Sequence, residues 1–360
     1  MSGPVSGDLA YAELDLRSNF SFLEGASHAD ELVLTAKALG LSAIGLADRN
    51  SLAGVVRAHV AAKAEGFRLL IGCRLVFLDG TELIVYPRDR AAYGRLCRLL
   101  SLGKMGNIHE GREDQDLNTD QDDRIAKGDC RLTFEQAAAL GEGLIGLVPA
   151  PLNLTTKTAA VFEVQMAAWQ RAWPDQVYLA AAPLRQGDDR ARLNRLAGIA
   201  QRTAAPLIAT NGVLYHDPSR RPLQDVLACV RQGCRLDEAG LRLQAHAERF
   251  LKRPTEMARL FRGHEEAVAR TMAVVDAARF SLDELQYDYP EEPIPPGKTA
   301  DQHLADLTWA GAQDRYPDGV PAKVQQSLIK ELDLIARVNY APYFLTVHDL
   351  VTFALSLMHI

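Results

Sequence analysis

The stretch Leu41-Ser42-Ala43-Ile44-Gly45-Leu46-Ala47-Asp48 sets the pattern from which the fold can be worked out. It is a short apolar run that follows an amphipathic segment over residues 28–39 and precedes another over residues 51–64. A run of this length between two helical patterns is typical of a β-strand flanked by helices. We therefore predict a strand over residues 43–47.

The same alternation of strands and helices recurs on both sides of this stretch. Strands are predicted over residues 12–16, 43–47, 69–78, 82–86, 144–148, 177–181 and 206–210, and helices over 28–39, 51–64, 88–102, 155–171 and 188–203. Ser27 and Asp30 have capping-box spacing at the start of the first helix, and Gly40 follows its end. Such alternation implies parallel pairing, in a barrel or a doubly wound sheet, and Asp79-Gly80 predicts one inserted antiparallel hairpin.

Changes in composition predict how the chain is divided. Residues 1–10 are rich in Gly, Ser and Pro and are expected to be a flexible N-terminus, followed by a first domain over residues 11–285. Within it, residues 103–131 form an acidic insertion, which we expect to be a solvated surface loop. The alternative, a cation site, lacks the glycine and the terminal glutamate of an EF-hand loop. Residues 286–298 are expected to be a linker.

Residues 299–360 are expected to form a second, incomplete unit. Helical patterns cover residues 299–316, 324–338 and 348–360, but no strand pattern accompanies them. The last pattern reaches Ile360 without a C-cap glycine, a basic final turn or a proline. We therefore expect the chain to be a fragment, from a truncated or interrupted reading frame.

Composition argues against several classes of protein. A net charge of −6 argues against a domain that coats nucleic acid through bulk positive charge. The five cysteines form neither a CxxC pair nor a Cys/His ladder, which argues against a disulfide framework and a structural zinc site. No stretch approaches the roughly 20 apolar residues that a membrane span needs. We expect a cytoplasmic protein with no membrane partner.

Three groups of residues carry a resemblance to a known family. They are Phe20-Ser21-Phe22-Leu23-Glu24-Gly25-Ala26-Ser27 with the stretch ending at Asp48, then Arg221-Pro222-Leu223-Gln224-Asp225-Val226-Leu227, and finally Tyr340-Ala341-Pro342-Tyr343-Phe344-Leu345-Thr346-Val347-His348-Asp349. They resemble the polymerase-and-histidinol-phosphatase (PHP) domain and early palm of bacterial C-family DNA polymerases. The form Leu-Thr-Val-His-Asp is most similar to the error-prone branch, with the replicative branch as the alternative. The resemblance implies an α/β fold, a PHP-type seven-stranded βα barrel followed by the helical start of a C-family polymerase palm domain.

The resemblance also implies where active PHP domains hold metal ions, namely at the ends of the barrel strands. Where the family has His-x-His, this chain has Asp15-Leu16-Arg17, and where the family has Asp-His, it has Asp48-Arg49. The acidic ligand after Gly-Cys corresponds to Arg74, and the final Asp-x-His to Gly212-Val213-Leu214. Arginine, glycine and leucine side chains cannot ligate a metal. We expect no metal and no catalytic residue at these degenerate positions, which are Asp15, Arg17, Asp48, Arg49, Arg74, Gly212 and Leu214.

The residues at these positions allow more than one arrangement. Substitute metal ligands would have to come from scattered histidines, whose spacing matches no ligand pattern: His28, His59, His109 and His216. Alternatively, the three arginines converge on the mouth of the barrel and pair with the two aspartates, supplying the positive charge of the lost metals. In a third arrangement the arginines point into solvent, where an ion pair contributes only about 0–1 kcal/mol.

The resemblance further implies a function for a longer protein. That function is DNA-directed DNA synthesis past damaged template in DNA repair, with DNA, deoxynucleoside triphosphates and repair-polymerase accessory proteins as partners. The family's palm binds Mg²⁺ through carboxylates that follow a Gly-Arg-Gly-Ser segment, and neither is present before Ile360. We expect a scaffold role without catalysis or a cofactor of its own. The alternatives are a PHP-type metal-dependent phosphoesterase or 3′-exonuclease, and a module that recruits repair partners.

Overall fold

The computed structural model describes residues 9–105, 125–126, 128–285 and 294–357. They fall into two compact units, Met1–Leu285 and Gln286–Ile360, and each unit is described by itself. Residues 1–8, most of the acidic insertion and most of the expected linker lie outside the described residues. The expectations for these segments therefore stay predictions.

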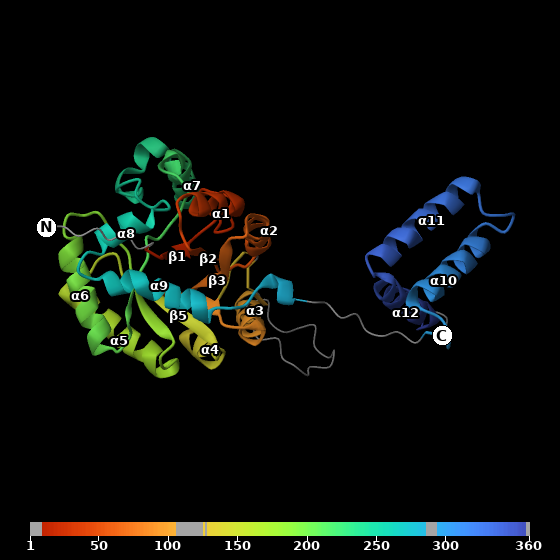
Figure 1. The fold of residues 1–360 in the computed structure, drawn as a ribbon, viewed down its shortest axis with the longest axis horizontal. Helices are drawn as coiled ribbons and strands as arrows, with labels where there is room; N and C mark the ends of the chain where they lie inside the picture. Colours follow the sequence, from red (N-terminus) through yellow and green to blue (C-terminus); the bar gives the residue numbers. More distant parts are fainter. Residues whose placement is uncertain (1–8, 106–124, 127, 286–293, 358–360) are drawn as a thin grey trace. The chain divides into compact units, whose positions relative to one another are not determined.

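The first unit is built on a seven-stranded sheet in which each strand pairs with the next one in the sequence (Figure 1). The strands are β1 (Ala12–Leu16), β2 (Ala43–Arg49), β3 (Arg68–Val76), β4 (Glu82–Pro87), β5 (Leu144–Pro149), β6 (Val177–Ala181) and β7 (Leu207–Ala209). Strand β4 runs antiparallel to both neighbours, and all other pairs are parallel. The predicted hairpin is confirmed, and Gly80 in its turn adopts a φ of 79°.

The two edge strands of this sheet approach each other at their carboxyl ends. The backbone N–H of Arg17 donates to the carbonyl of Val213 at 3.0 Å, and the N–H of Val213 donates to the carbonyl of Asp15 at 2.7 Å. Val213 lies just after β7, so these bonds bring β1 next to the other end of the sheet. The sheet is a nearly closed barrel, which decides between the two predicted architectures. We call the end where the parallel strands finish the barrel mouth.

Helices connect the strands and extend the first unit after β7. Between strands lie α1 (Ala29–Ala38), α2 (Val55–Glu65), α3 (Arg90–Met105), α4 (Phe134–Ala139), α5 (Thr156–Ala172) and α6 (Asp189–Arg202), and after β7 lie α7 (Arg221–Gln232), α8 (Pro254–Leu260) and α9 (Glu265–Ala277). The predicted capping box of α1 was one residue early, because His28 is the N-cap and Glu31 completes the box. Among the described helices, none combines the length and the apolar character that crossing a membrane requires.

Apolar side chains fill the inside of the barrel and the layer between its strands and helices. The inner group includes Leu14, Leu70 and Tyr86, and a fully buried side chain of this kind contributes about 1.5–3 kcal/mol. The hydroxyl of Tyr86 crosses the interior and donates to the carbonyl of Leu14 at 2.6 Å. Its ring requires glycine on the facing strands, since a Cβ at Gly45 or Gly72 would lie 2.3 or 2.4 Å from Tyr86 atoms. The apolar run that predicts β2 thus also contains the glycine that admits this ring.

The second unit consists, in its described part, of α10 (Ala300–Arg315), α11 (Ala322–Arg337) and α12 (Ala341–Leu357). The predicted start of α12 at residue 348 was wrong, because the helix already begins at Ala341 and tolerates Pro342 in its first turn. A small core forms around Leu304 and Leu345. The described α11 contains no buried residue, and α12 exposes large apolar side chains.

Candidate functional site

The barrel mouth gathers charged side chains from segments that are far apart in the sequence. They come from the ends of β1 and β2, from the loop after β1, from β3 and β4, from α7 and from the segment before α8. The arginines are Arg17, Arg49, Arg74, Arg231 and Arg249, and the carboxylates are Asp15, Glu24, Asp48 and Glu82. This cluster includes the five charged residues among the positions that the resemblance predicts to be degenerate, namely Asp15, Arg17, Asp48, Arg49 and Arg74.

Arg74 forms the innermost ion pair of the mouth. Its guanidinium is 2% exposed, on the same face of β3 as the inward-pointing Leu70. One terminal nitrogen donates to Asp15 and the other to Glu82. Burial alone would raise the pKa of Asp15, but the charges of Arg74 and Arg17 outweigh it and hold that pKa below its usual value. The predicted pairing of Arg74 with an aspartate is confirmed, and Arg74 does not point into solvent.

Glu24 is a second anchor of the mouth, and it receives three arginines. Its side chain is 8% exposed and lies 3.1 Å from Nη1 of Arg17, 2.7 Å from Nη1 of Arg49 and 3.0 Å from Nη1 of Arg231. Burial opposes the charged form, but the arginines dominate and lower the pKa of Glu24. The predicted pairing of Arg17 and Arg49 with the aspartates was therefore wrong, because Glu24 takes both.

Asp48 binds hydroxyl and backbone groups instead of an arginine. Its Oδ1 accepts from the backbone N–H of Ser18 at 2.8 Å and from the hydroxyl of Ser21 at 2.7 Å, while its Oδ2 accepts from the hydroxyl of Ser18 at 2.7 Å. Burial raises the pKa of Asp48 although these hydrogen bonds oppose the shift. Asp48 thus holds the loop after β1 against the end of β2, and this loop carries Glu24 to the arginines.

A fifth carboxyl group, Glu13, ties β1 to the segment after β7. It accepts from the hydroxyl of Tyr11 at 2.8 Å and from the backbone N–H groups of Asp15 and Asn211, each at 2.9 Å. Burial raises the pKa of Glu13 to about 8, although the hydrogen bonds from Asp15, Tyr11 and Asn211 oppose the shift. Gly212, which comes next after Asn211, has no side chain to contribute.

Leu214 is the last of the positions that the resemblance predicts to be degenerate, and its apolar side chain cannot ligate a metal. Its side chain is 3% exposed and packs with Ala26 and Tyr215 in a small apolar cluster. The carbonyl of Gly212 instead accepts from Nε of Arg249 at 2.7 Å. The segment after β7 therefore contributes backbone groups and apolar packing to the mouth.

The residues of the mouth do not fit a divalent metal. The guanidinium of Arg74 lies against Asp15, and two serines bind Asp48, so both carboxylates are directed at protein donors. Within the described ranges no three His, Cys, Asp or Glu side chains come together as metal ligands could. The histidines have other contacts: His28 caps α1, His59 lies 3.3 Å from Asp283, and His216 lies 2.7 Å from Ser27. His109 lies outside the described residues.

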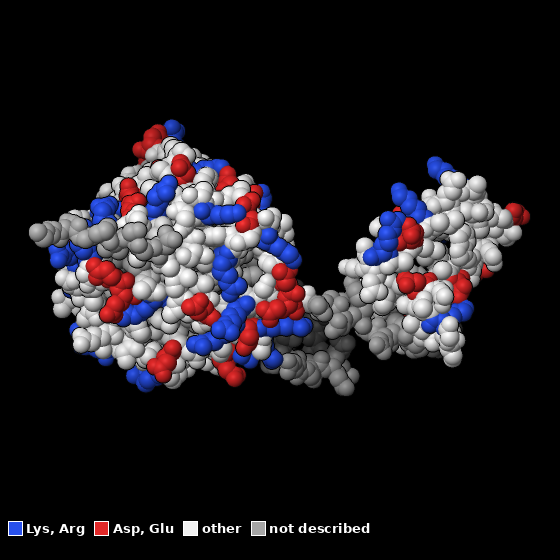
Figure 2. Space-filling model, viewed as in Figure 1, with Lys and Arg blue, Asp and Glu red and all other residues white. Residues whose placement is uncertain are grey.

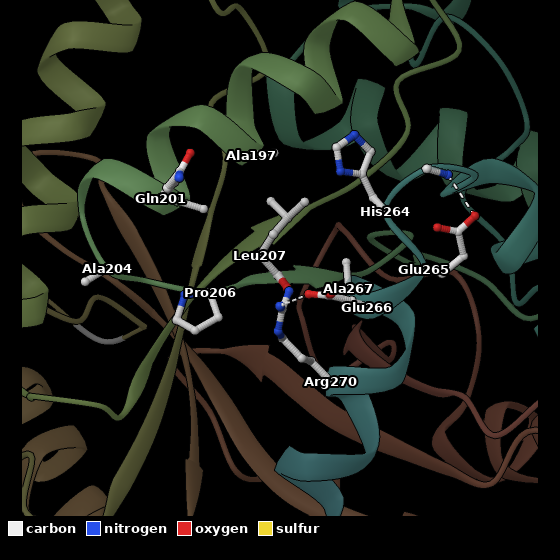
Figure 3. A pocket seen from close by; sticks show the side chains of 12 residues that line it. Ala197, Gln201, Ala204, Pro206, Leu207, His264, Glu265, Glu266, Ala267 and Arg270 are labelled. Carbon is white, nitrogen blue, oxygen red and sulfur yellow. Dashed lines mark hydrogen bonds and ion pairs between the residues drawn. The ribbon is translucent and has the colours of Figure 1, made fainter.

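A separate hollow lies at the opposite end of β7, between α6 and α9 (Figure 3). Its volume is about 530 Å³. Arg270 beside it donates to the carbonyl of Leu207 at 2.9 Å and pairs with Glu266, while His264 lies 2.9 Å from Asn194. Its polar groups are thus engaged with the protein and do not converge on an enclosed point, as those of a ligand site would. The mouth remains the candidate site.

The visible face of the barrel unit carries charged side chains of both signs. Figure 2 shows basic and acidic side chains interspersed over the visible face of the barrel unit. Binding of nucleic acid through bulk charge would instead need a contiguous basic face. The visible surface therefore agrees with the interpretation drawn from net charge.

Comparisons with known proteins identify both units. The family model described as "PHP domain" matches residues 13–179, and the model described as "Bacterial DNA polymerase III alpha NTPase domain" matches residues 302–357. The first match and the seven-stranded barrel show a PHP-type α/β fold. An amidohydrolase from Chromobacterium violaceum is 17% identical, with a TM-score of 0.40 over 57% of this chain and 88% of that chain.

Full-length relatives are similar to nearly the whole chain. The error-prone DNA polymerase of Caulobacter vibrioides is 49% identical over 96% of this chain and 30% of its own length. That of Brucella abortus is 50% identical over 96% of this chain and 30% of its own length. The chain thus spans about three-tenths of the length of these relatives. Over the part that it spans, the chain belongs to the family of the bacterial error-prone DNA polymerases, and its first unit contains a PHP domain.

Proposed function

We propose that this chain supplies the PHP scaffold of an error-prone DNA polymerase and performs no hydrolysis itself. The observation that carries the proposal is the ion-paired mouth, in which buried Arg74 contacts Asp15 where a hydrolytic barrel needs free ligands. A hydrolytic metal centre requires carboxylates and neutral imidazoles that together activate water. Here the carboxylates bind arginines and serines instead.

The same contacts explain how the mouth acts as a scaffold. Three segments meet at Glu24: the loop after β1 through Arg17, the end of β2 through Arg49, and α7 through Arg231. Asp48 fixes the loop that carries Glu24. These ion pairs connect segments that are distant in the sequence and so stabilise the mouth of the barrel. Metal ions would connect such segments in a PHP domain that binds metals. The chain then needs no cofactor of its own.

DNA synthesis belongs to the longer polymerase in this proposal. Template DNA and deoxynucleoside triphosphates are its substrates, and Mg²⁺ held by palm carboxylates stabilises the charge that develops during nucleotidyl transfer. Residues 299–360 form the start of that palm. The exposed apolar side chains of α11 and α12 support the assignment to a larger palm domain, because exposed apolar surfaces favour packing against other parts of a protein. We further propose that the longer polymerase binds repair-polymerase accessory proteins and is located in the cytoplasm.

Metal content tests the scaffold role. The purified 360-residue chain is dialysed against zinc and manganese, and its metal content is measured by mass spectrometry beside phosphatase and 3′-exonuclease assays. We expect about 0.1 equivalent of metal or less and no hydrolysis, since tight binding needs deprotonated, correctly placed ligands. Two or more tightly bound ions with turnover would establish the phosphoesterase alternative. In that case Asp48→Asn should lower both the metal content and the turnover.

A chimera tests the polymerase part. This chain replaces the matching segment of the Caulobacter vibrioides relative, and primer extension is measured on intact and abasic templates. Extension close to that of the parent is expected for the chimera, and none for the chain alone. A folded chimera that fails to extend on either template would contradict the proposal.

A further inference from the structure

The barrel mouth holds more arginine than its carboxylates pair with. Glu24 receives three arginines, and Arg74 occupies both Asp15 and Glu82. Asp48 is bound by serines, and Glu13 accepts from the hydroxyl of Tyr11 and from the backbone N–H groups of Asp15 and Asn211. Among the described residues, the fifth mouth arginine, Arg249, has no carboxylate at ion-pair distance.

Arg249 is held in place by one hydrogen bond and keeps its terminal nitrogens free. Its Nε donates to the carbonyl of Gly212 at 2.7 Å, and a Cβ at Gly212 would lie 2.7 Å from its Nη2. Burial and then the charge of Arg17 lower the pKa of Arg249 to about 10, so the group is still charged at pH 7. Within the described part of the chain, neither Nη1 nor Nη2 has a hydrogen-bond acceptor.

Two neighbouring guanidinium groups also retain unused donors. Nε of Arg17 and Nε of Arg74 are buried and have no hydrogen-bond partner among the described residues. Both groups, like Arg249, lie close enough to Asp15 to lower its pKa. Buried donors without acceptors are rare in folded proteins, so the unused donors of these three guanidinium groups favour a further acceptor at the mouth.

We propose that the barrel mouth binds a phosphate-type oxyanion between Arg17 and Arg249. A tetrahedral phosphate carries several acceptor oxygens and up to two negative charges, which match the planar donor forks of arginine. A carboxylate ligand would carry only one charge and a planar pair of oxygens. The site binds without making or breaking a covalent bond and needs no metal. It goes beyond the proposed scaffold role, with which it shares the Arg17–Glu24 ion pair.

Calorimetric titration of the 360-residue chain with inorganic phosphate tests this site, at pH 7.5 and an ionic strength kept constant with sodium chloride. We expect one phosphate per chain and a rise in melting temperature with phosphate. Arg249→Gln should weaken binding about tenfold or more, since it removes a charge-assisted contact. Arg253→Gln changes an exposed arginine of the same segment and should leave the affinity unchanged. Arg249→Lys keeps the charge and should bind with intermediate affinity.

Two further comparisons complete the test. A 5′-phosphorylated oligonucleotide that competes with phosphate, when its unphosphorylated form does not, would identify a DNA end as the source of the anion. Absence of that competition would identify free phosphate. The proposal is overturned if the wild-type chain shows neither heat nor a melting shift, or if Arg249→Gln or Arg249→Lys, shown to be folded by circular dichroism, binds as the wild type does. Equal losses in Arg249→Gln and Arg253→Gln would indicate general screening and would also overturn it.

Discussion

In the barrel unit, large side chains such as Leu16, Tyr86 and Trp169 are at most 1% exposed, whereas in the three-helix unit Leu350 and Phe353 are 63% exposed. A sheet that closes on itself and is covered by helices gives its strands apolar neighbours on both faces. Three helices cover only part of one another's surface. Burial therefore concentrates the free energy of folding of the described residues in the barrel unit.

Charged pairs differ between the two units in the same way. The side chains of Arg74 and Asp15 are 2% and 7% exposed, whereas those of Arg337 and Asp333 on α11 are 69% and 60% exposed. A buried pair has lost its hydration and depends on its partner, while water replaces either member of an exposed pair. The same kind of contact therefore has different energetic consequences in the two units.

The largest expected effect comes from breaking the buried pair. Arg74→Met leaves Asp15 buried without its main partner and should lower the free energy of unfolding by about 3–5 kcal/mol. Arg337→Met, the matched change in the three-helix unit, should cost about 0.5 kcal/mol or less. Urea unfolding followed by circular dichroism measures both. Similar losses for the two variants would remove the contrast between the units.

The second effect concerns Glu24. Glu24→Gln removes the charge shared by three arginines, and because two of these are nearly half exposed and regain water, we expect a loss of about 1–3 kcal/mol. The pKa values of Glu24 and Asp15 are lowered in the folded state, so their stabilisation is complete above the unfolded pKa values and is lost as pH falls through the folded ones. The variant should therefore lose less stability than the wild type on acidification below about pH 4.

The third effect concerns Glu13, whose contribution to stability depends on pH in the opposite direction to those of Glu24 and Asp15. Its pKa is about 8 when folded against an ordinary value of 4.5, so between these limits the folded chain holds a proton that the unfolded chain releases. Stability should fall by about 1.4 kcal/mol per pH unit as pH rises through this window, and this contribution is absent above pH 8. Unfolding of the wild type and of Glu13→Gln at pH 5, 6 and 7 isolates the slope. Parallel curves for the two proteins would show that Glu13 is ionised in the fold.

The smallest effect is expected on the exposed face of α12. Phe353→Gln should change the free energy of unfolding by no more than about 0.5 kcal/mol, because the ring is already in water. The same variant should reduce self-association in light scattering, since it interrupts an exposed apolar surface. Phe261→Gln is the matched change in the barrel unit, where the ring is fully buried, and it should destabilise strongly. A large loss for Phe353→Gln would show that α12 is packed.

Local features of the sequence made much of the barrel predictable. Strands β1 and β6 begin and end as predicted, because short apolar runs bounded by helical patterns are typical of buried strands. The start of α12 was missed because Pro342 is compatible with a first helical turn, so that the residue type alone does not mark the boundary. Pairing of Arg74 with Asp15 could be predicted, since the parallel strands of a barrel, including β1 and β3, bring their carboxyl ends to one mouth.

By itself, the sequence determined the strand and helix alternation, the hairpin at Gly80 and the presence of Arg17, Arg49 and Arg74 at positions where the resemblance predicts metal ligands. These features depend on the type of each residue and on its near neighbours in the chain, and both can be read directly from a sequence. Only the tertiary structure decided that Glu24 receives Arg49 and that Arg249 lies at the same mouth. The first contact depends on the loop after β1, which Asp48 holds through two serines. The second depends on the segment before α8, where Arg249 donates to the carbonyl of Gly212. Because charge attraction depends on distance in space, the separation of these residues in the sequence does not reveal such contacts.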